Sequence, residues 1–355
     1  MEAAPRPFDT PPEKRATVRA ALRRQFCVVP PAVKDVDLGG KTAIVTGSNG
    51  GMGLECARQL LGLGLTRLIL AVRNEQKGQQ ARTTLLSEHQ LPDDAIDVWE
   101  LDMLSYDSII AFTERAKTLD RVDIAVLNAG IFNQKFKMVN AYPASSHEET
   151  IQLNVLSTTL LSILLLVVLK AKRLPPSNTP GRLVVVSSDV SSFAKFKERN
   201  HQPLLPSFNE PKLFDGWERY CTSKLLGQLA ISELAKRVDP SIAIITLPNP
   251  GLCYGTHLGQ LPGTNIVDMI GSFIKRIFGR HPSVGARTIT AGAVKFGREA
   301  HGQYVEDGKL EPLAPFAYEP QGERVAQLLW DQMMEELSFA KVEEILEGLR
   351  TPSSK

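Results

Sequence analysis

The sequence predicts an α/β fold, a doubly wound parallel sheet of about seven strands with helices on both faces. Three observations favour it. Short β-branched runs alternate with longer stretches of helical period from Lys41 onward. A glycine-rich turn lies between the first of these runs and the first helical stretch. Several runs are followed by polar residues, at the strand ends where such sheets bind ligands.

The chain divides into an N-terminal extension and one large domain. Residues 1–38 form the extension, which opens and closes with prolines, and its middle, Ala16–Phe26, is expected to be a short basic helix. Its arginines could contact an anionic lipid surface, but packing or solvation of one face is the preferred interpretation. Residues 39–350 form the domain that carries the alternating pattern.

Seven runs are expected to form the sheet, because each is short, apolar and bounded by turn residues. In chain order they are Thr42–Val45, Leu68–Val72, Ile96–Leu101, Ile124–Leu127, Leu183–Val186, Ile242–Leu247 and, with a weaker pattern, Gln303–Val305. The most apolar run, Val155–Leu169, is too short to span a bilayer and contains four hydroxyl side chains. We therefore expect a buried helix there and no membrane span.

The glycine-rich turn follows the first strand and precedes a helical pattern that starts at Leu54. It reads Thr46-Gly47-Ser48-Asn49-Gly50-Gly51-Met52-Gly53. Glycines at this position let the backbone approach a pyrophosphate, and the free N–H groups of the helix start favour its negative charge. The turn predicts a dinucleotide site, with a glycine-rich loop that binds nothing as the alternative.

The end of the second strand indicates which dinucleotide would bind. A carboxylate there would bind the ribose 2′-hydroxyl of NAD, whereas an arginine accommodates the 2′-phosphate of NADP. The strand ends in Arg73 with no acid beside it, which favours NADP(H), although a solvated surface arginine is the alternative. Asp102, just past the third strand, is placed to meet the adenine edge or to cap a helix.

Two residues with acid–base chemistry lie four apart on a helix expected from Trp217 to Lys236. Tyr220 and Lys224 therefore share one face of that helix. A nearby ammonium favours the phenolate and is expected to lower the tyrosine pKa, which makes the pair a usable acid or base. The pair alone is weak evidence, since this spacing is common by chance.

The order of the motifs along residues 40 to 310 resembles the short-chain dehydrogenase/reductase family. The matching motifs are Thr46-Gly47-x-x-x-Gly51-x-Gly53, Asn128-Ala129-Gly130, Asn154, Ser188, Tyr220-x-x-x-Lys224 and Pro250-Gly251 with Thr256. Within the family the chain is most similar to retinol-dehydrogenase-like reductases and their relatives in fungal secondary metabolism, from Leu70–Asn74 and the long extension. The resemblance implies a Rossmann-type domain.

The resemblance also implies a role for each catalytic position. Tyr220 would donate a proton to a substrate carbonyl oxygen, and Ser188 would hydrogen-bond the same oxygen, with Ser187 as its nearest competitor. Lys224 would hold the nicotinamide ribose, and Asn154 would complete a proton relay through water. Without the resemblance, Asn154 would be interpreted as a polar residue inside a helix.

The cofactor contacts that the resemblance implies come from the glycine-rich turn, the strand ends and the catalytic pair. They are Gly47, Ser48, Asn49, Gly51, Met52, Gly53, Arg73, Asn74, Asp102, Met103, Asn128, Ala129, Gly130, Tyr220, Lys224, Pro250, Gly251 and Thr256.

The chain departs from the family pattern between Ser188 and Tyr220, where 31 residues replace a much shorter interval. We expect a loop at the rim of the active site at about 195–215, and a flexible lid with apolar walls at about 256–283. The helices at 148–172 and 217–236 commonly build a dimer interface in this family. The resemblance therefore allows a homodimer, although the N-terminal extension counts against it.

Composition narrows the partners and the compartment. Forty-one basic and 39 acidic residues give a net charge of +2, too balanced for capture of a nucleic acid. The four cysteines lie far apart with no paired spacing, and the chain starts without the basic and apolar segments of a signal peptide. We therefore expect a cytoplasmic protein and identify no metal site.

The leading hypothesis is an NADP(H)-dependent oxidoreductase that reduces a ketone or aldehyde of a mostly apolar small molecule, or oxidises the matching alcohol, within secondary metabolite biosynthesis. One alternative is a nucleotide-sensing protein that keeps the fold without catalysis. The other is a cyclase or isomerase that uses the same pocket for non-redox chemistry.

Overall fold

The computed structural model describes residues 8–142, 145–172, 179–254 and 279–350, which are built around an eight-stranded sheet. In spatial order its strands are β10 (Lys309–Glu311), β9 (Gln303–Glu306), β8 (Ala243–Asn249), β7 (Gly181–Val185), β4 (Ile124–Leu127), β1 (Thr42–Thr46), β2 (Arg67–Val72) and β3 (Ile96–Glu100). Every neighbouring pair is parallel except β9 and β10. The chain runs outward from β1 in both directions, which is the doubly wound arrangement.

Alternate residues of the central strands face two separate cores, as the pleat of a strand dictates. In β1, Ala43 and Val45 belong to the core on one face, whereas Ile44 belongs to the core on the other. Both faces are covered, which explains why these strands are apolar runs without an alternating polar pattern.

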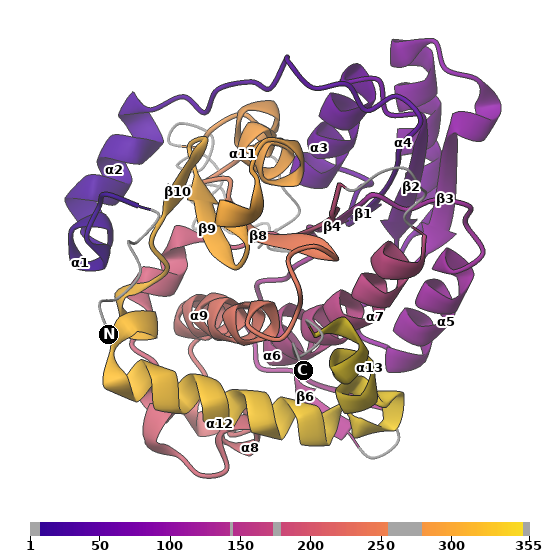
Figure 1. Ribbon diagram of the computed structural model, residues 1–355. Coiled ribbons are helices and arrows are strands. Elements are labelled where there is room, and N and C mark those ends of the chain that lie inside the picture. The colour runs from indigo at the N-terminus through magenta and orange to yellow at the C-terminus, as the bar shows by residue number, and fades with distance from the viewer. Residues whose placement is uncertain (1–7, 143–144, 173–178, 255–278, 351–355) are drawn as a thin grey trace, which may run out of the picture.

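Helices cover the sheet in layers (Figure 1). One face carries α3 (Gly51–Gly62), α4 (Glu75–His89) and α11 (Pro282–Val294), and the other carries α5 (Tyr106–Ala116), α7 (Thr158–Ala171) and α9 (Gly216–Ala235). Two further helices, α12 (Pro320–Glu336) and α13 (Val342–Leu349), lie outside α9 and α7 as a third layer. The remaining helical pieces are short: α6 (Glu149–Ile151), α8 (Leu204–Ser207), the π-helical η2 (Gln152–Ser157), and the 3₁₀ turns η1 (Asp93–Ala95), η3 (Asp189–Phe193), η4 (Lys197–Asn200), η5 (Pro211–Leu213), η6 (Arg298–Ala300), η7 (Pro315–Tyr318) and η8 (Ser338–Ala340).

The seven predicted strands are confirmed to within two residues at each end, and the doubly wound fold class is confirmed with them. Three strands were not expected. A hairpin of β5 (Met138–Tyr142) and β6 (Ser145–Glu148) stands apart from the main sheet, and β10 adds an antiparallel edge. Each is short and partly polar, so none carries the apolar run on which the prediction depended.

The apolar run at 155–169 is a buried helix, as expected. By length and composition the stretch Glu149–Ala171 could cross a membrane, but 89% of its most apolar window is buried inside the fold. Two of its hydroxyl groups donate to carbonyls one turn or so earlier in the helical stretch: Ser162 to Thr158 at 2.7 Å, and Thr158 to Leu153 at 2.8 Å. This helix is therefore part of the core.

The stretch at 195–215 contains more structure than the predicted loop. It forms η4, α8 and η5, and it buries Phe196, Leu204 and Phe208 completely. The Leu205 N–H donates to the Gln332 side chain of α12 at 2.9 Å. The prolines of this stretch indicated a loop, but its apolar side chains anchor it to the body of the domain. Most of the predicted lid at about 256–283 lies outside the described residues.

The N-terminal extension forms α1 (Pro12–Arg15) and α2 (Val18–Cys27), in agreement with the predicted short helix. Figure 1 shows both helices beside β9 and β10, although some 290 residues separate the two segments in sequence. Arg15 is buried, and its Nε donates to Glu306 of β9 at 3.1 Å. The extension is thus docked on the carboxyl end of the sheet.

Candidate active site

The glycine-rich turn lies at the carboxyl end of β1 and leads into α3. Gly47 and Gly51 adopt positive φ angles of 62° and 56°, which L side chains rarely adopt. At Gly53 an added Cβ would lie 2.5 Å from the Gly47 carbonyl oxygen, so only glycine permits this close packing of turn and helix. The turn therefore exposes backbone N–H groups at the start of α3, where they can bind an anion.

The ends of β1 and β4 are tied together beside this turn. The Thr46 hydroxyl accepts hydrogen bonds from the backbone N–H groups of Asn128 and Ala129, each at 3.0 Å. The Asn128 side chain donates to the carbonyls of Thr46 and Gly47 at 3.1 and 3.2 Å. These bonds fix the separation of the two loops that form the floor of the pocket.

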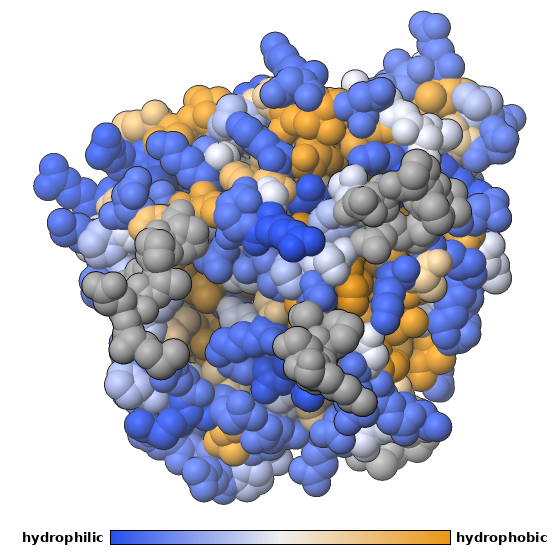
Figure 2. Space-filling model, in the orientation of Figure 1, coloured by the Kyte–Doolittle hydropathy of each residue, from blue (hydrophilic) through white to orange (hydrophobic). Residues whose placement is uncertain are grey.

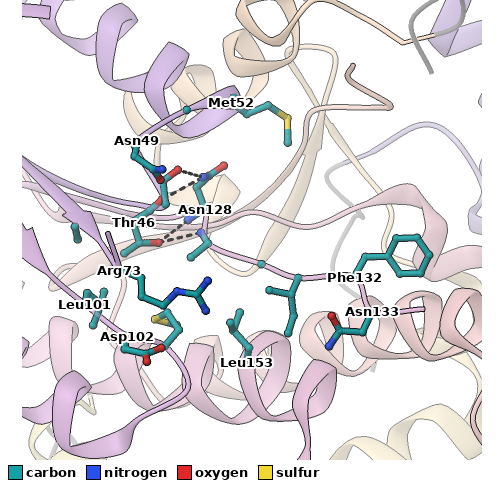
Figure 3. Close-up of a pocket in the computed structure, with 18 residues that line it drawn as sticks. Thr46, Asn49, Met52, Arg73, Leu101, Asp102, Asn128, Phe132, Asn133 and Leu153 are labelled. Atoms are coloured by element: carbon teal, nitrogen blue, oxygen red, sulfur yellow. Dashed lines mark hydrogen bonds between the residues drawn. The ribbon is translucent and has the colours of Figure 1, made fainter. Parts of the chain in front are cut away.

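A cavity of about 390 Å³ opens between these loops (Figure 3). Its lining comes from the carboxyl ends of β1, β2, β3 and β4: Thr46, Gly47, Asn49, Gly50, Gly51, Met52, Ala71, Arg73, Leu101, Asp102, Met103, Asn128, Ala129, Gly130, Ile131, Phe132, Asn133 and Leu153. In Figure 3, Arg73 and Asp102 lie at one end, and Phe132 and Asn133 at the other. An elongated ligand in this cavity would contact different residues at its two ends.

Arg73 is exposed and makes no hydrogen bond or ion pair with any residue that the structure describes. Its guanidinium is therefore available to a ligand. The Asp102 carboxylate accepts from the Leu104 N–H at 3.0 Å, and the N-cap of α5 is Ser105. The alternative in which Asp102 is the N-cap of that helix is therefore wrong, because Asp102 begins the turn that precedes the cap and lines the pocket.

The pocket continues from Gly130 toward the catalytic residues predicted from the sequence. A Cβ built on Gly130 would lie 3.4 Å from the Asn154 side-chain oxygen and 3.7 Å from Lys224 Nζ. Lys224 Nζ lies 5.9 Å from the centre of the Tyr220 ring, and it donates to the Val186 carbonyl at 3.1 Å. The fold thus places Tyr220, Lys224 and Asn154 together near one end of the cavity.

The protonation of the pair differs from the expectation. Burial raises the pKa of Tyr220 well above its ordinary value, and nearby Cys221 and Asp189 add to the rise. Burial also lowers the pKa of Lys224 to about 8. Lys224 was expected to lower the tyrosine pKa, but the loss of hydration on burial is the largest influence and raises it instead. Tyr220 is consequently a neutral phenol at pH 7, a state suited to donating a proton.

The two adjacent serines have different surroundings. The Ser187 hydroxyl is buried and accepts a hydrogen bond from the Gln228 side-chain nitrogen at 3.1 Å. The side-chain oxygen of Gln228 accepts in turn from the Ala314 N–H. The Ser188 hydroxyl is partly exposed and accepts a long contact of 3.4 Å from the Val190 N–H. Ser187 therefore belongs to a structural network, and Ser188 is free to turn toward a substrate.

Asn154 lies in the π-helical segment η2, an irregularity often found at functional sites. Its side-chain oxygen accepts from the Ile131 N–H at 3.0 Å, and its amide donates to the Ile131 carbonyl at 2.9 Å and to Ser223 at 3.0 Å. The side chain therefore clamps the loop after β4. A separate cavity of about 20 Å³, lined by Asn154, Lys224 and Gly227 among others, has room for one water.

Some predicted cofactor residues do not line the main cavity. The Ser48 hydroxyl is buried against the Val45 carbonyl, and Asn74 caps α4 by accepting from the Lys77 N–H at 2.9 Å. Gly53 is buried behind the turn. Pro250 and Gly251 follow β8, outside the lining of this cavity, and Thr256 lies outside the described residues.

Other lining residues were missed. The clearest is Phe132, whose ring lies 5.3 Å from that of Tyr220 and 6.3 Å from that of Trp217. These three rings form an aromatic cluster at the end of the pocket nearest Tyr220. Phe132 follows Asn128-Ala129-Gly130 at once, so its position after a ligand-binding strand end was the signal that could have identified it.

Comparison with known proteins gives the same family by two routes. The profile of the family described as short chain dehydrogenase matches residues 41–199. The chain is 46% identical to the short-chain dehydrogenase fogG of Aspergillus ruber over 96% of this chain and 98% of that one. It is 40% identical to the short chain dehydrogenase/reductase mfmJ of Annulohypoxylon moriforme over 89% of this chain and 90% of the relative.

Solved structures share the fold. A short chain dehydrogenase from Escherichia coli CFT073, complexed with NADPH, superposes with a TM-score of 0.55 at 20% identity, over 78% of this chain and 99% of that one. An alcohol dehydrogenase from Thermococcus sibiricus, complexed with 5-hydroxy-NADP, gives a TM-score of 0.51 at 19% identity, over 75% and 95%. At these identities the likeness concerns the fold alone.

Proposed function

This chain belongs to the short-chain dehydrogenase family, and from that premise we propose that it is an NADP(H)-dependent reductase of ketones or aldehydes. The observation that carries the proposal is the meeting of two features at Gly130. The cavity that fits a dinucleotide ends there, and Asn154 and Lys224 border the same glycine. A cofactor whose reactive end reached Gly130 would lie beside the acid–base pair.

The turn fits a nicotinamide dinucleotide because Gly47 and Gly51 adopt positive φ angles and line the cavity, which brings the backbone and the start of α3 close to a bound pyrophosphate. The choice of NADP(H) is supported by Arg73, whose guanidinium lines the cavity without an ion-pair partner in the described part of the chain. A 2′-phosphate would supply that partner through two charge-assisted hydrogen bonds. Several solved structures of similar fold are NADP or NADPH complexes, which agrees with this choice.

The residues perform the reaction as follows in this proposal. The bound nicotinamide supplies or accepts the hydride. Tyr220, a neutral phenol below its raised pKa, gives its proton to the carbonyl oxygen, and Ser188 donates a hydrogen bond to the same oxygen as negative charge develops there. Lys224 holds the ribose and returns a proton to Tyr220 through a water beside Asn154.

The substrate in this proposal is a mostly apolar small molecule, because Phe132 and Trp217 flank Tyr220 and offer flat apolar surfaces. We propose a role in secondary metabolite biosynthesis and a cytoplasmic location. The location is supported by the four cysteines, which are all unpaired in the structure.

The test follows NADPH and NADH absorbance with a panel of aromatic and aliphatic carbonyls and alcohols, for wild type, Tyr220→Phe and Arg73→Ala. Wild type should turn over at least one carbonyl with NADPH. Tyr220→Phe should lower kcat by about 10²- to 10⁴-fold, the usual contribution of general acid catalysis, with NADPH affinity unchanged. Arg73→Ala should weaken NADPH binding about tenfold or more and leave NADH binding unchanged.

Three outcomes would contradict parts of the proposal. If wild type binds NADPH but consumes neither cofactor with any substrate, a nucleotide-sensing role replaces the redox reaction. If it transforms a substrate without net cofactor turnover, the pocket performs a cyclisation or isomerisation. If NADH is preferred and Arg73→Ala leaves that preference intact, the NADP(H) assignment is wrong.

A further inference from the structure

Helix α2 of the N-terminal extension is docked with its apolar side outward. The helix has no buried residue. Val18, Leu22 and Phe26 recur at a spacing of four on one exposed face, with exposed fractions of 62%, 51% and 52%, and Val29 follows at 69%. These four are the majority of the seven large apolar side chains exposed anywhere in the described part of the chain. Such a cluster on a surface indicates a binding face.

Polar contacts hold the helix in this orientation from the other side. Arg24 forms an ion pair with Glu306 at 2.9 Å, and its Nη1 donates to the Arg15 carbonyl at 3.1 Å. Arg280, in turn, donates to the carbonyls of Arg24 and Val28 at 2.6 and 3.0 Å. The buried ion pair fixes the rotation of α2 about its axis, so the outward apolar face is built into the fold.

The apolar face extends toward the segment that follows β8. The Gln25 side chain makes two hydrogen bonds with the backbone of Leu252. It donates to the Leu252 carbonyl at 3.0 Å and accepts from the Leu252 N–H at 3.1 Å. The Leu252 side chain is itself 44% exposed. We call Val18, Leu22, Phe26, Val29 and Leu252 the α2 patch. Its location places it beside the carboxyl end of the sheet, the end at which the cavity opens.

Basic side chains accompany the patch. Arg19 and Arg23 are exposed on the adjoining stripe of α2, and the helix contains no acidic residue. Figure 2 shows hydrophobic residues next to hydrophilic ones in the left part of this face, where α2 lies in Figure 1. Apolar side chains flanked by arginines match a bilayer surface with anionic headgroups, which accepts both.

We propose that the α2 patch docks the protein on an anionic lipid bilayer, with α2 lying in the plane of the interface. A second protein would match the apolar side chains equally well, but it would give no reason for Arg19 and Arg23, which are exposed beside the patch and form no ion pair with the described residues. Docking is peripheral and reversible, because the patch offers one short helix rather than a spanning segment. It would bring the mouth of the cavity close to the layer in which apolar molecules concentrate.

The test is co-flotation of the full chain with phosphatidylcholine vesicles that contain either no phosphatidylserine or about one third of it. Wild type should float with the anionic vesicles only. Arg19→Gln with Arg23→Gln should weaken this binding about 30-fold, because each arginine near an anionic surface contributes about fivefold. Leu22→Ser should weaken it about tenfold through lost apolar burial.

Matched controls distinguish binding through the α2 patch from nonspecific binding to vesicles and from misfolding. Met138→Ser removes an apolar side chain that is exposed elsewhere, and Arg324→Gln with Arg350→Gln removes two exposed charges from the α12 and α13 layer. Both controls should float like wild type. All variants should keep the wild-type melting temperature and soluble-phase activity, since none of these side chains contacts the cavity.

The proposal is overturned if wild type fails to float with anionic vesicles, or if the α2 variants float as well as the controls. Self-association of wild type that Leu22→Ser abolishes, with no flotation, would assign the patch to a second copy of this chain instead. Because flotation needs neither cofactor nor substrate, its outcome is independent of the proposed reaction.

Discussion

At the scale of single residues, burial controls the acid–base chemistry of this site. Tyr220 and Lys224 lie in one poorly hydrated volume, which favours the neutral form of each: the phenol pKa rises and the ammonium pKa falls to about 8. The Tyr220 phenol is therefore protonated at neutral pH, and of the two residues Lys224 is the one that titrates near physiological pH.

The first prediction concerns this titration. A lysine is charged below its pKa and neutral above it, so the charged form of Lys224 is lost as pH rises through about 8. We expect kcat/KM for carbonyl reduction to decrease above that pH, while Tyr220 stays protonated. The measurement is a pH profile of kcat/KM between pH 6 and 10, because this parameter reports the free enzyme.

Lys224→Arg is the matched variant for this prediction, since a guanidinium stays charged throughout that range. Its activity will be lower, but its profile should show no decrease near pH 8. An alkaline limb at the same pH in the variant would assign the titration to another group.

The second prediction separates the two serines. Ser188→Ala should lower kcat about 10²-fold, as expected for loss of a hydrogen bond to the developing oxyanion, with little change in melting temperature. Ser187→Ala should affect stability rather than catalysis. It removes one hydrogen-bond acceptor of the Gln228 side-chain nitrogen and should lower the free energy of unfolding by about 1 kcal/mol, with kcat within a few-fold of wild type. Steady-state kinetics and urea unfolding of both variants check this pattern. A larger kcat loss in Ser187→Ala would reverse the assignment.

At the scale of elements, the N-terminal extension contributes to the geometry of the carboxyl end of the sheet. The contacts form a chain: Glu306 accepts from Asn249 at 2.5 Å, and Asn249 accepts from the Gly251 N–H at 3.1 Å. Arg15 and Arg24 approach the same Glu306 from the extension. The segment after β8, in which the family resemblance implies cofactor contacts at Pro250 and Gly251, is also held by the hydrogen bonds between Gln25 and Leu252, which are 227 residues apart.

The third prediction tests the contacts between the extension and the segment after β8. Gln25→Ala removes both hydrogen bonds to Leu252, and we expect the Kd for NADPH to rise about fivefold, because the segment after β8 loses its support. Fluorescence titration of NADPH measures this directly. KM for the carbonyl should also rise, whereas kcat at saturating cofactor and substrate should fall less than twofold.

Arg23→Gln is the control for this experiment, since it lies on the same helix and makes no hydrogen bond or ion pair with the described residues. It should bind NADPH like wild type. Equal Kd values for Gln25→Ala and wild type would show that the extension does not reach the cofactor site.

At the scale of the whole molecule, the C-terminal helices form an outer layer. The surfaces of α7 and α9, on which the resemblance allowed a homodimer, are covered by α13 and α12 of the same chain. The Lys170 ammonium donates to the Gly348 carbonyl at 2.7 Å, and Arg237 stacks on Trp330 at 4.4 Å. These helices have no exposed face for such an interface, because the outer layer already buries it.

The fourth prediction is that the chain is a monomer of 39.0 kDa in dilute solution. Light scattering after size exclusion at micromolar concentration checks this mass. Met333→Ala, which removes a fully buried contact between α12 and the helices below, should lower the free energy of unfolding by about 2–5 kcal/mol. A dimer of twice the mass would require an interface other than α7 and α9.

The sequence by itself determined the positions of seven strands along the chain, the glycine-rich turn and the presence of Tyr220 and Lys224 on one face of a helix. These features depend on local patterns: β-branched runs, glycines that permit positive φ, and a spacing of four on one helix. The positions of Arg73 and Asp102 followed too, since strand ends in a doubly wound sheet converge on one edge. Short polar strands such as β10, and residues such as Phe132, carry no comparable periodic signal.

Only the tertiary structure decided which charges are buried and which surfaces are covered. The pKa directions at Tyr220 and Lys224, the different surroundings of Ser187 and Ser188, and the outward face of α2 all depend on neighbours distant in sequence. Arg15 and Glu306, for example, are 291 residues apart and meet in the core. Such contacts have no local signature, because the free energy of a buried charge is set by everything that surrounds it.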